Sequence, residues 1–327
     1  MAGTTLLLTD LYLPISEDLT VVERLFDEEL RSDFGFVNEL CDGVRSYRGK
    51  MLRPALTLLT ARAIGKLTDA HRTLAAVVEM VHMATLVHDD VLDEADERRG
   101  QPPPNAIAGN VAAVLLGDYL ISHAFHLCSS LQSQHASRRI GATTNIVCQG
   151  ELLQSQHRGN ADLPEHIYLD IVGRKTGVLT AVACELGAHQ AGADRTVVEA
   201  MRSYGMSAGI AFQIIDDVLD IVGDRGSVGK TLGLDLLMGK ATLPTIHCLR
   251  NASDTTAAAL RKVVGRAASV DGERLRAWLG ETDSINYAVS CAKKHVADAI
   301  HNLGLLPHSD ARASLTALAE FIVNRQF

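Results

Sequence analysis

The sequence predicts an all-α protein, and three observations support this prediction. Long segments of the 327-residue chain repeat their apolar side chains with the period of a helix, and no stretch alternates as a strand does. Apolar residues make up 47% of the chain, which is ample for a large core, whereas aromatic residues make up only 4%. Because no linker rich in Pro, Gly or Ser interrupts these segments, we expect one domain that covers residues 1–327.

The first helix is marked by a start signal. Ser16 is a candidate N-cap, the acids Glu17 and Asp18 follow it, and the apolar pattern continues to Leu30. A break is expected around residues 32–35.

A basic stretch that contains glycine and proline, residues 48–54, leads into another helix. Lys50 and Arg53 lie three residues apart, so they share one face if both lie in its first turn. Cations are disfavoured at a helix N-terminus unless an anion lies beside them. The pair is therefore a candidate anion-binding site, and a basic surface turn is the alternative.

Residues 74–96 are expected to form one long helix with a stripe of residues along one face. The stripe consists of Glu79, His82, Leu86, Asp89, Asp93 and Asp96, which recur at spacings of three and four. His82 would lie about 10 Å from Asp89 along the helix axis. We interpret it as a ligand-binding residue, with a buried core histidine as the alternative. His88 lies off the stripe and is expected to be structural.

The pentapeptide Asp-Asp-Val-Leu-Asp occurs twice, at residues 89–93 and 216–220, each time after an apolar helical segment. The first copy opens a stretch, residues 89–97, with six acids in nine residues. Carboxylates so close together repel one another, and near a helix C-terminus they oppose the macrodipole. A solvated acidic helix end is the alternative for either copy alone. The duplication favours hard divalent cations such as Mg²⁺, which takes oxygen ligands and shares its sites with phosphates.

Basic residues follow both copies of the pentapeptide, namely Arg98, Arg99, Lys230 and Lys240. Acids suited to a metal beside bases suited to a phosphate indicate a site for a metal-bound diphosphate. The loop at residues 223–231 is not a nucleotide-binding P-loop, because position 224 is Asp and a helix, not a strand, precedes it.

Further helices are expected at residues 110–131, 137–156 and 198–221, and in several segments after residue 254. Another helix begins at residues 163–165 and is expected to end in or near residues 173–177.

Composition excludes several classes of protein. The net charge of −8 offers no surface for nucleic acid, and the six scattered cysteines form neither a disulfide framework nor a zinc site. The N-terminus lacks the basic start of a signal peptide. The most apolar long window, residues 106–125, contains Asn110, Asp118 and His123, which argues against a transmembrane span. We expect a soluble cytoplasmic protein.

Between about Arg48 and Pro244 the chain resembles the all-trans polyprenyl diphosphate synthases, which elongate E-isoprenyl chains, and most of all their octaprenyl and other long-chain members. The resembling segments are residues 49–54, 82–93, 98–100, 117–119, 175–176, 212–220, 229–230, 235–236, 239–240 and 242–244. The chain departs from the family's Gly-Gly-Lys-Arg-Leu-Arg-Pro pattern at Arg48 and Met51. Lys50 and Arg53, which the family uses, are retained.

The resemblance implies a single large bundle of long helices around a deep central cavity, with the two aspartate motifs facing each other across its mouth. It implies three Mg²⁺ ions, for which Mn²⁺ can substitute. Asp89 and Asp93 would hold two ions and Asp216 the third, with Asp90, Asp217 and Asp220 in support. The allylic diphosphate site would comprise Arg98, Lys175, Thr176, Gln213, Lys230 and Lys240, and the isopentenyl diphosphate site Lys50, Arg53, His82 and Arg99. The residues implied to be catalytic are Asp89, Asp93, Asp216, Lys175 and Lys230.

The implied reaction is a 1′-4 condensation of isopentenyl diphosphate with an allylic diphosphate. The allylic C–O bond ionises because metals and lysines stabilise the leaving diphosphate. The double bond of isopentenyl diphosphate attacks the cation in a dry cavity, and a proton then leaves. The resemblance also suggests a homodimer.

Three alternatives are weighed against this function. A class I terpene cyclase is disfavoured because the second motif is a full Asp-Asp-x-x-Asp and Lys50, Arg53 and His82 are present. A regulatory subunit of a heteromeric synthase is disfavoured because both motifs are intact. A geranylgeranyl (C20) diphosphate synthase differs only in product length.

Product length is expected to depend on Ala84 and Thr85, which precede the first motif. In the resembling family, bulk at these positions closes the tunnel for the growing chain, and both residues here are small. We therefore expect a medium or long product of C25 or more. Close helix packing is the alternative reason for small residues, and Phe125 is a candidate for closing the tunnel deeper.

Overall fold

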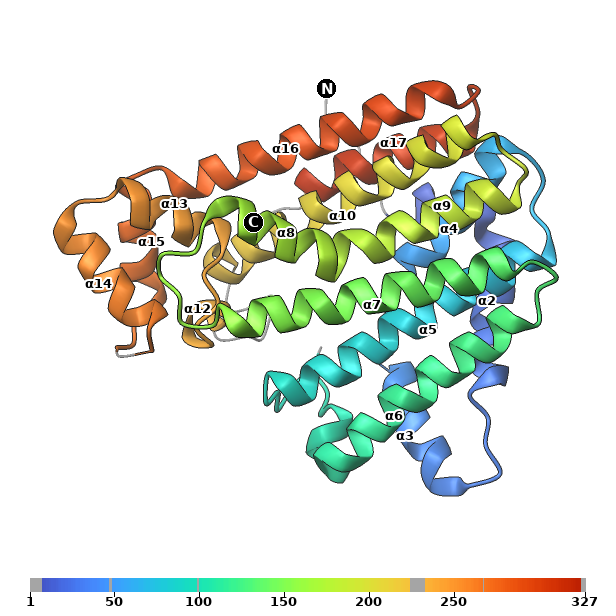
Figure 1. The fold of residues 1–327 in the computed structure, drawn as a ribbon, viewed down its shortest axis with the longest axis horizontal. Helices are drawn as coiled ribbons and strands as arrows, with labels where there is room; N and C mark the ends of the chain where they lie inside the picture. Colours follow the sequence, from blue (N-terminus) through green and yellow to red (C-terminus); the bar gives the residue numbers. More distant parts are fainter. Residues whose placement is uncertain (1–7, 47–48, 99, 224–232, 267, 325–327) are drawn as a thin grey trace. The chain divides into compact units, whose positions relative to one another are not determined.

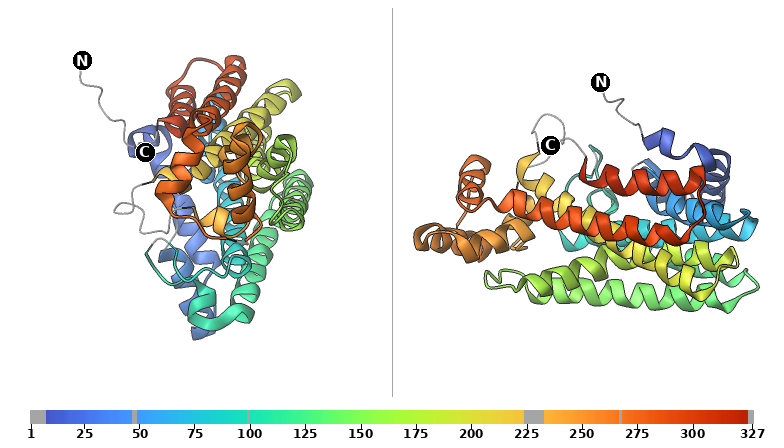
Figure 2. Two further views of the ribbon diagram at one scale, coloured as in Figure 1. Left: turned by 90° about the vertical axis from the view of Figure 1, so that its left-hand side faces the viewer. Right: turned by 90° about the horizontal axis from the view of Figure 1, so that it is seen from above.

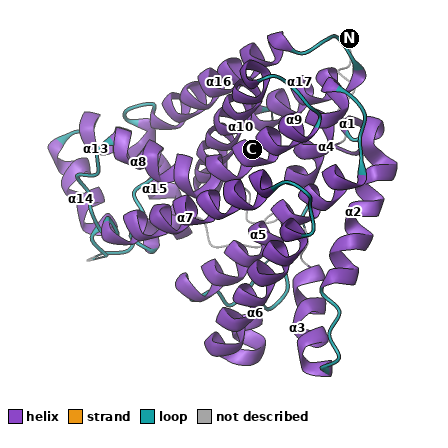
Figure 3. Ribbon diagram, turned by 45° about the vertical axis from the view of Figure 1, so that its right-hand side comes forward, coloured by secondary structure: helices purple, strands orange, loops and turns teal. Residues whose placement is uncertain are grey.

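A computed structural model describes residues 8–46, 49–98, 100–223, 233–266 and 268–324, and it confirms the all-α prediction (Figure 1). Within the described residues the helices are joined by loops without any strand, apart from one isolated bridge between Arg98 and Gln101 (Figure 3).

The chain divides into two compact units. Unit 1 comprises Met1–Thr144, Leu179–Gly205 and Asn302–Leu318, and unit 2 comprises Asn145–Val178, Met206–His301 and Ala319–Phe327. The expectation of one domain over the whole chain stays a prediction.

The helices of unit 1 are α1 (Leu8–Leu11), α2 (Ser16–Glu29), α3 (Gly35–Ser46), α4 (Leu52–Ile64), α5 (Asp69–Leu92), α6 (Pro104–Ser129) and nearly all of α9 (Val178–Gln190). Those of unit 2 are α8 (Glu165–Val172), α12 (Leu234–Leu237), α13 (Leu243–Asn251), α14 (Asp254–Val264), α15 (Gly272–Gly280) and nearly all of α16 (Ser284–Asn302). The boundary between the units divides three further helices more evenly, namely α7 (Gln134–Gln156), α10 (Arg195–Val222) and α17 (Asp310–Val323).

Helix α5 is the centre of unit 1, and α2, α4 and α6 pack against it (Figure 1). Its residues from Leu74 to Met83 are buried almost without interruption except at His82, as expected of a helix that is covered on several sides. The helix starts five residues earlier than predicted, because Thr68 and His71 form a capping box. It ends at Leu92, so Asp96 of the predicted stripe lies outside it.

Helices α5 and α6 approach each other closely at Gly117. A Cβ atom at this position would lie 2.1 Å from Nε2 of His88, so only glycine leaves room for the imidazole. The same nitrogen lies 3.2 Å from the carbonyl oxygen of Val114. His88 is therefore a packing residue, as expected from its position off the stripe.

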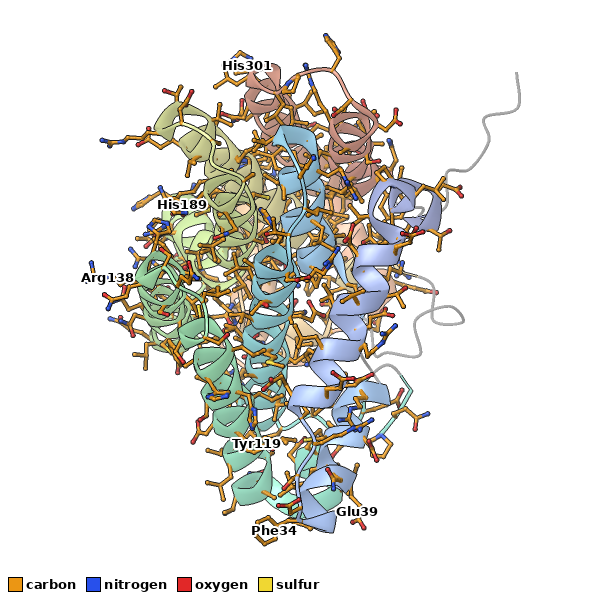
Figure 4. All side chains as sticks on the ribbon, turned by 90° about the vertical axis from the view of Figure 1, so that its right-hand side faces the viewer. Phe34, Glu39, Tyr119, Arg138, His189 and His301 are labelled. Atoms are coloured by element: carbon orange, nitrogen blue, oxygen red, sulfur yellow. The ribbon has the colours of Figure 1, made fainter. Side chains whose placement is uncertain are left out.

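Helix α6 combines a buried side with an exposed apolar one. Its exposed apolar residues are Ile107, Val111, Val114, Leu115 and Phe125, and this set is called the α6 stripe below. Helix α3, which the exposed Phe34 directly precedes, lies beside α6 near Tyr119 (Figure 4). By length and composition alone α6 could cross a membrane, and 39% of its most apolar window is buried.

In unit 2, the short helix α13 packs against α8, α14 and α15, and the last two lie with it among the orange helices of Figure 2. The helix predicted to end near residues 173–177 does not end there. Gly173–Gly177 forms a π-helical turn, and α9 continues directly after it. At Gly177 a Cβ atom would lie 2.6 Å from Sδ of Met206, so glycine allows this turn to pack on α10.

Candidate active site

The first aspartate motif forms the last turn of α5. Asp89 and Asp93 are half-buried, and the backbone N–H of Asp93 donates to the carbonyl oxygen of Asp89 at 2.8 Å. Asp90 is fully buried, and Nε of Arg98 donates to its Oδ1 at 2.6 Å. The amide of Asn105 donates to the carbonyl oxygens of Asp90 and Ala95, which ties the following loop to the helix. The second acid of the motif therefore faces an internal cation, while the first and fifth remain accessible.

The basic segment that precedes α4 has an unusual backbone conformation. The helix begins at Leu52, and Met51 before it is buried in the left-handed region at φ 50°. Lys50 is exposed and lies outside the helix, whereas Arg53 is half-buried in its first turn. Lys50 and Arg53 therefore do not share a helical turn. Lys50 lies directly before Met51, and Arg53 lies two residues after it.

The predicted ligand-binding and chain-length residues of α5 lie N-terminal to the motif. His82 is half-buried, and its carbonyl oxygen accepts a hydrogen bond from Oγ1 of Thr85 at 2.7 Å. Ala84 is fully buried and Thr85 is half-buried.

The second aspartate motif lies near the C-terminal end of α10 and shows the same burial pattern. Asp216 and Asp220 are half-buried, whereas Asp217 is only 5% exposed. The hydroxyl of Tyr168 on α8 donates to Oδ2 of Asp217 at 2.6 Å, and Nε2 of Gln213 donates to Oδ1 at 2.8 Å. Its neighbours are thus neutral hydrogen-bond donors rather than a cation.

The surroundings of Asp217 change its acidity. Burial, helped by the charge of Asp235, raises the pKa of Asp217 to about 8, although the hydrogen bonds from Tyr168 and Gln213 act in the opposite direction. Burial and the neighbouring carboxyl also raise the pKa of Tyr168 well above its ordinary value. The hydroxyl therefore keeps its proton and acts as a donor to the carboxyl group.

The last acid of the second motif holds the start of α12. The carboxylate of Asp220 accepts the backbone N–H of Leu234 at 3.3 Å and that of Asp235 at 3.2 Å. Lys240 follows α12, and its Nζ lies 3.8 Å from Oδ1 of Asp235 with only 11% of the side chain exposed.

The π-helical turn before α9 carries two more predicted residues. Nζ of Lys175 lies 2.7 Å from the carboxylate of Glu151 and 2.6 Å from Oε1 of Gln154, both on α7. The hydroxyl of Thr176 donates to Oε1 of Gln213 at 2.9 Å. Hydrogen bonds thus connect the turn to the helix of the second motif.

The structure groups the predicted site residues as follows. Unit 1 holds Lys50, Arg53, His82, Ala84, Thr85, Asp89, Asp90, Asp93 and Arg98, and unit 2 holds Lys175, Thr176, Gln213, Asp216, Asp217, Asp220 and Lys240. Arg99 and Lys230 lie outside the described residues. Sequence reasoning assigned no role to Tyr168, although a tyrosine buried on an apolar helix needs a hydrogen-bond partner.

The donor atoms fit a cation that completes its shell with other ligands. Among the residues that the structure describes, no group of three or more His, Cys, Asp or Glu side chains could hold a metal ion by itself. Each motif instead presents half-buried carboxylates one turn apart. Mg²⁺ typically takes one or two carboxylates and completes its shell with water and substrate phosphates, so the donor set fits it.

Comparisons with known proteins identify a family of similar chains. The family model "Polyprenyl synthetase" matches residues 36–279. The octaprenyl diphosphate synthase of Escherichia coli (strain K12) is 34% identical over 95% of this chain and 96% of its own length. Component 2 of the heptaprenyl diphosphate synthase of Bacillus subtilis (strain 168) is 33% identical over 97% of this chain and 90% of its own. A polyprenyl synthase from Caulobacter crescentus CB15, solved with calcium and isoprenyl diphosphate, is 33% identical with a TM-score of 0.94 over 98% of this chain and 99% of its own.

Proposed function

The chain belongs to the polyprenyl synthetase family and is a prenyltransferase, and from this premise we propose that it condenses isopentenyl diphosphate with an allylic diphosphate in a Mg²⁺-dependent reaction. The observation that carries the proposal is the matched burial of the two motifs. In both copies the first and fifth acids are half-buried and the second is buried. Two helices thus present the same accessible carboxylates.

In this proposal, Asp89 and Asp93 bind two Mg²⁺ ions and Asp216 binds a third, with Mn²⁺ as a substitute. Mg²⁺ bound there neutralises the diphosphate and so makes it a better leaving group. The other three acids support these ligands: Asp90 through Arg98, Asp217 through Tyr168 and Gln213, and Asp220 through the start of α12.

The two diphosphates are proposed to bind different basic residues. Lys50, Arg53, His82 and Arg99 serve isopentenyl diphosphate, and Arg98, Lys175, Thr176, Gln213, Lys230 and Lys240 serve the allylic diphosphate. Lys175 is held by Glu151 and Gln154, which fixes its ammonium group before substrate binds. Arg53→Ala is expected to weaken mainly isopentenyl diphosphate binding. A loss of affinity for the allylic substrate alone would reverse this assignment.

The decisive experiment is incubation of the purified chain with labelled isopentenyl diphosphate, an allylic primer and Mg²⁺, followed by sizing of the products. We expect linear products of C25 or longer, and the relatives named for heptaprenyl and octaprenyl products support this length. A C20 product would be consistent with the family but would refute the predicted product length of C25 or more. Inactivity of the chain alone, with activity restored by a second protein, would identify it as one component of a heteromeric enzyme. Cyclised products would indicate a cyclase.

The length of the product is proposed to depend on Ala84, which is fully buried on α5 one turn and a half before Asp89. A phenyl ring there would occupy space that the growing chain needs. Ala84→Phe is expected to shorten the product toward C15 or C20 while the first condensation continues. An unchanged product distribution would place the floor of the tunnel elsewhere, with Phe125 as the next position to vary.

We propose that two copies of the chain associate through the α6 stripe. Val111 is 76% exposed and Leu115 is 62% exposed, and adjacent apolar residues of this kind favour a protein interface. Leu115→Glu is expected to yield monomers in analytical ultracentrifugation, whereas Leu305→Glu, at another exposed leucine of unit 1, is expected to leave the dimer intact. A monomeric wild-type protein would refute the dimer.

Residence in the cytoplasm belongs to the same proposal. The packing of α6 on α5 and the exposed carboxylate of Asp118 support a helix at a protein surface rather than one in a bilayer. Fractionation of cells that produce the chain is expected to leave it in the supernatant after ultracentrifugation.

A further inference from the structure

Three hydrogen bonds in unit 2 connect four side chains in one chain. Thr176 donates to Oε1 of Gln213 at 2.9 Å, and Nε2 of Gln213 donates to Oδ1 of Asp217 at 2.8 Å. Tyr168 donates to the other carboxylate oxygen, Oδ2, at 2.6 Å. This series of hydrogen bonds begins in the π-helical turn beside Lys175, passes through α10, and ends at Tyr168, which is 4% exposed.

The chemistry of these groups fixes the direction of each bond. Nε2 of Gln213 donates to Asp217, so the amide oxygen of Gln213 is the atom that accepts from Thr176. The Thr176 hydroxyl donates its proton to Gln213, so the lone pairs of the hydroxyl oxygen point away from Gln213. The orientation of the whole chain therefore depends on the position of the Asp217 carboxyl group.

Tyr168 is what fixes that carboxyl group from the interior. Asp217 is 5% exposed, so water cannot readily replace the hydroxyl, and a buried carboxyl oxygen without its donor is costly. Loss of the donor would favour rotation of the carboxyl group, and Gln213 and Thr176 would lose their fixed orientation with it.

We propose that Tyr168 is a positioning residue for the allylic half of the site. This inference rests on the proposed function, in which Thr176 and Gln213 bind the allylic diphosphate and Asp216 binds a metal. Tyr168 acts through Asp217 in two directions. Along α10 it fixes the neighbouring Asp216, and through Gln213 it fixes the turn that carries Lys175 and Thr176.

Unit 2 also contains a matched control for this hydroxyl. Tyr287 donates to both carboxylate oxygens of Glu165, at 2.9 and 3.0 Å. The pair repeats the chemistry of a tyrosine on a carboxylate, but no hydrogen bond found in the described residues leads from it to the second motif.

The test compares Tyr168→Phe with Tyr287→Phe in full-length enzyme with Mg²⁺. For Tyr168→Phe, the KM for the allylic diphosphate and the Mg²⁺ concentration for half-maximal rate are expected to rise about tenfold, as for a lost hydrogen bond to a buried carboxyl. The KM for isopentenyl diphosphate is expected to stay within about twofold of wild type, since that site uses other residues. Tyr287→Phe is expected to behave as wild type in all three measurements.

A lower melting temperature with unchanged kinetic constants in Tyr168→Phe would show a purely structural role and overturn the proposal. An equal rise in KM for both substrates would also overturn it. Absence of any prenyl product from the wild-type enzyme would refute the proposed function instead, so the two failures are distinguishable.

Thr176, at the other end of this series of hydrogen bonds, supplies a second check, and its single variant does not depend on the folding of Tyr168→Phe. Thr176→Val removes the hydroxyl and is expected to raise the KM for the allylic diphosphate. Combined with Tyr168→Phe, Thr176→Val is expected to raise the KM for the allylic diphosphate by less than the product of the two single increases, because Tyr168→Phe already disturbs the orientation of the Thr176 hydroxyl. Additive losses, or a silent Thr176→Val, would contradict a connected chain.

Discussion

Asp90 and Asp217 occupy the same position in identical pentapeptides and are both buried, yet their neighbours differ in charge. Arg98 contacts Asp90 from the loop that follows α5. Tyr168 and Gln213 contact Asp217 without any charge, and burial raises the pKa of Asp217. The difference teaches that the motif specifies where its carboxylates point, while the surrounding chain decides how each buried one is stabilised.

The accessible acids are where the two copies are expected to behave alike. Asp89→Ala and Asp216→Ala are each expected to lower turnover by about 10²–10³-fold or more, because each removes a proposed ligand of the Mg²⁺ that would stabilise charge on the leaving diphosphate. Excess EDTA is expected to abolish turnover and added Mg²⁺ to restore it. Steady-state kinetics with circular dichroism as a check of folding measure both effects. Full activity in EDTA would contradict metal dependence, and loss in only one variant would break the equivalence of the copies.

The buried acids are where the copies are expected to differ. Arg98→Met leaves Asp90 buried without its cation, and we expect a loss of about 2 kcal/mol in the free energy of unfolding, less than for a fully buried pair because Arg98 is partly exposed. Tyr168→Phe is expected to cost about 1 kcal/mol, because it removes one hydrogen bond and no charge. Urea unfolding without substrates measures both. Equal losses in the free energy of unfolding would show that a charged and a neutral partner stabilise the two buried acids equally.

A second substitution sharpens the same contrast. Asp90→Asn, added to Arg98→Met, removes the uncompensated charge and is expected to restore about 1 kcal/mol. Asp217→Asn, added to Tyr168→Phe, removes little charge, because burial raises the pKa of Asp217 to about 8, and it is expected to change stability by less than about 0.5 kcal/mol. Rescue at position 217 as large as at position 90 would mean that charge matters equally in both places.

The smallest effect is expected at the opposite end of α5 and concerns pH. Burial lowers the pKa of His71 below its ordinary value, so the unfolded chain binds a proton that the folded chain resists. Stability is therefore expected to fall as the pH drops below about 6.5. His71→Gln keeps a capping side chain at this position and is expected to flatten the slope. An unchanged slope would assign the acid sensitivity to other groups, such as His135 and His295, whose pKa values burial also lowers.

The sequence was sufficient for the helical class, the two motifs and most of the helices, because apolar periodicity and a duplicated pentapeptide are local signals. It placed the end of one helix at residues 173–177, where a π-helical turn instead continues the chain into α9. Two glycines there looked like a stop signal, and only their packing on α10 shows otherwise. The roles of Arg98 toward Asp90 and of Tyr168 toward Asp217 were also missed, since contacts between segments leave no periodic trace.

The contact between His88 and Gly117 has a consequence for testing the proposed role of Ala84 and Thr85 in product length. Ala84 and Thr85, the positions to randomise in a mutant library, lie on α5 within one turn or so of His88. A larger residue at position 117 would collide with the imidazole and force either the His88 side chain or α6 to move, whatever had been selected at positions 84 and 85. A library that keeps His88 and Gly117 constant retains the packing of α5 on α6. Changes in product length can then be attributed to the residues at positions 84 and 85 and not to a shift of α6.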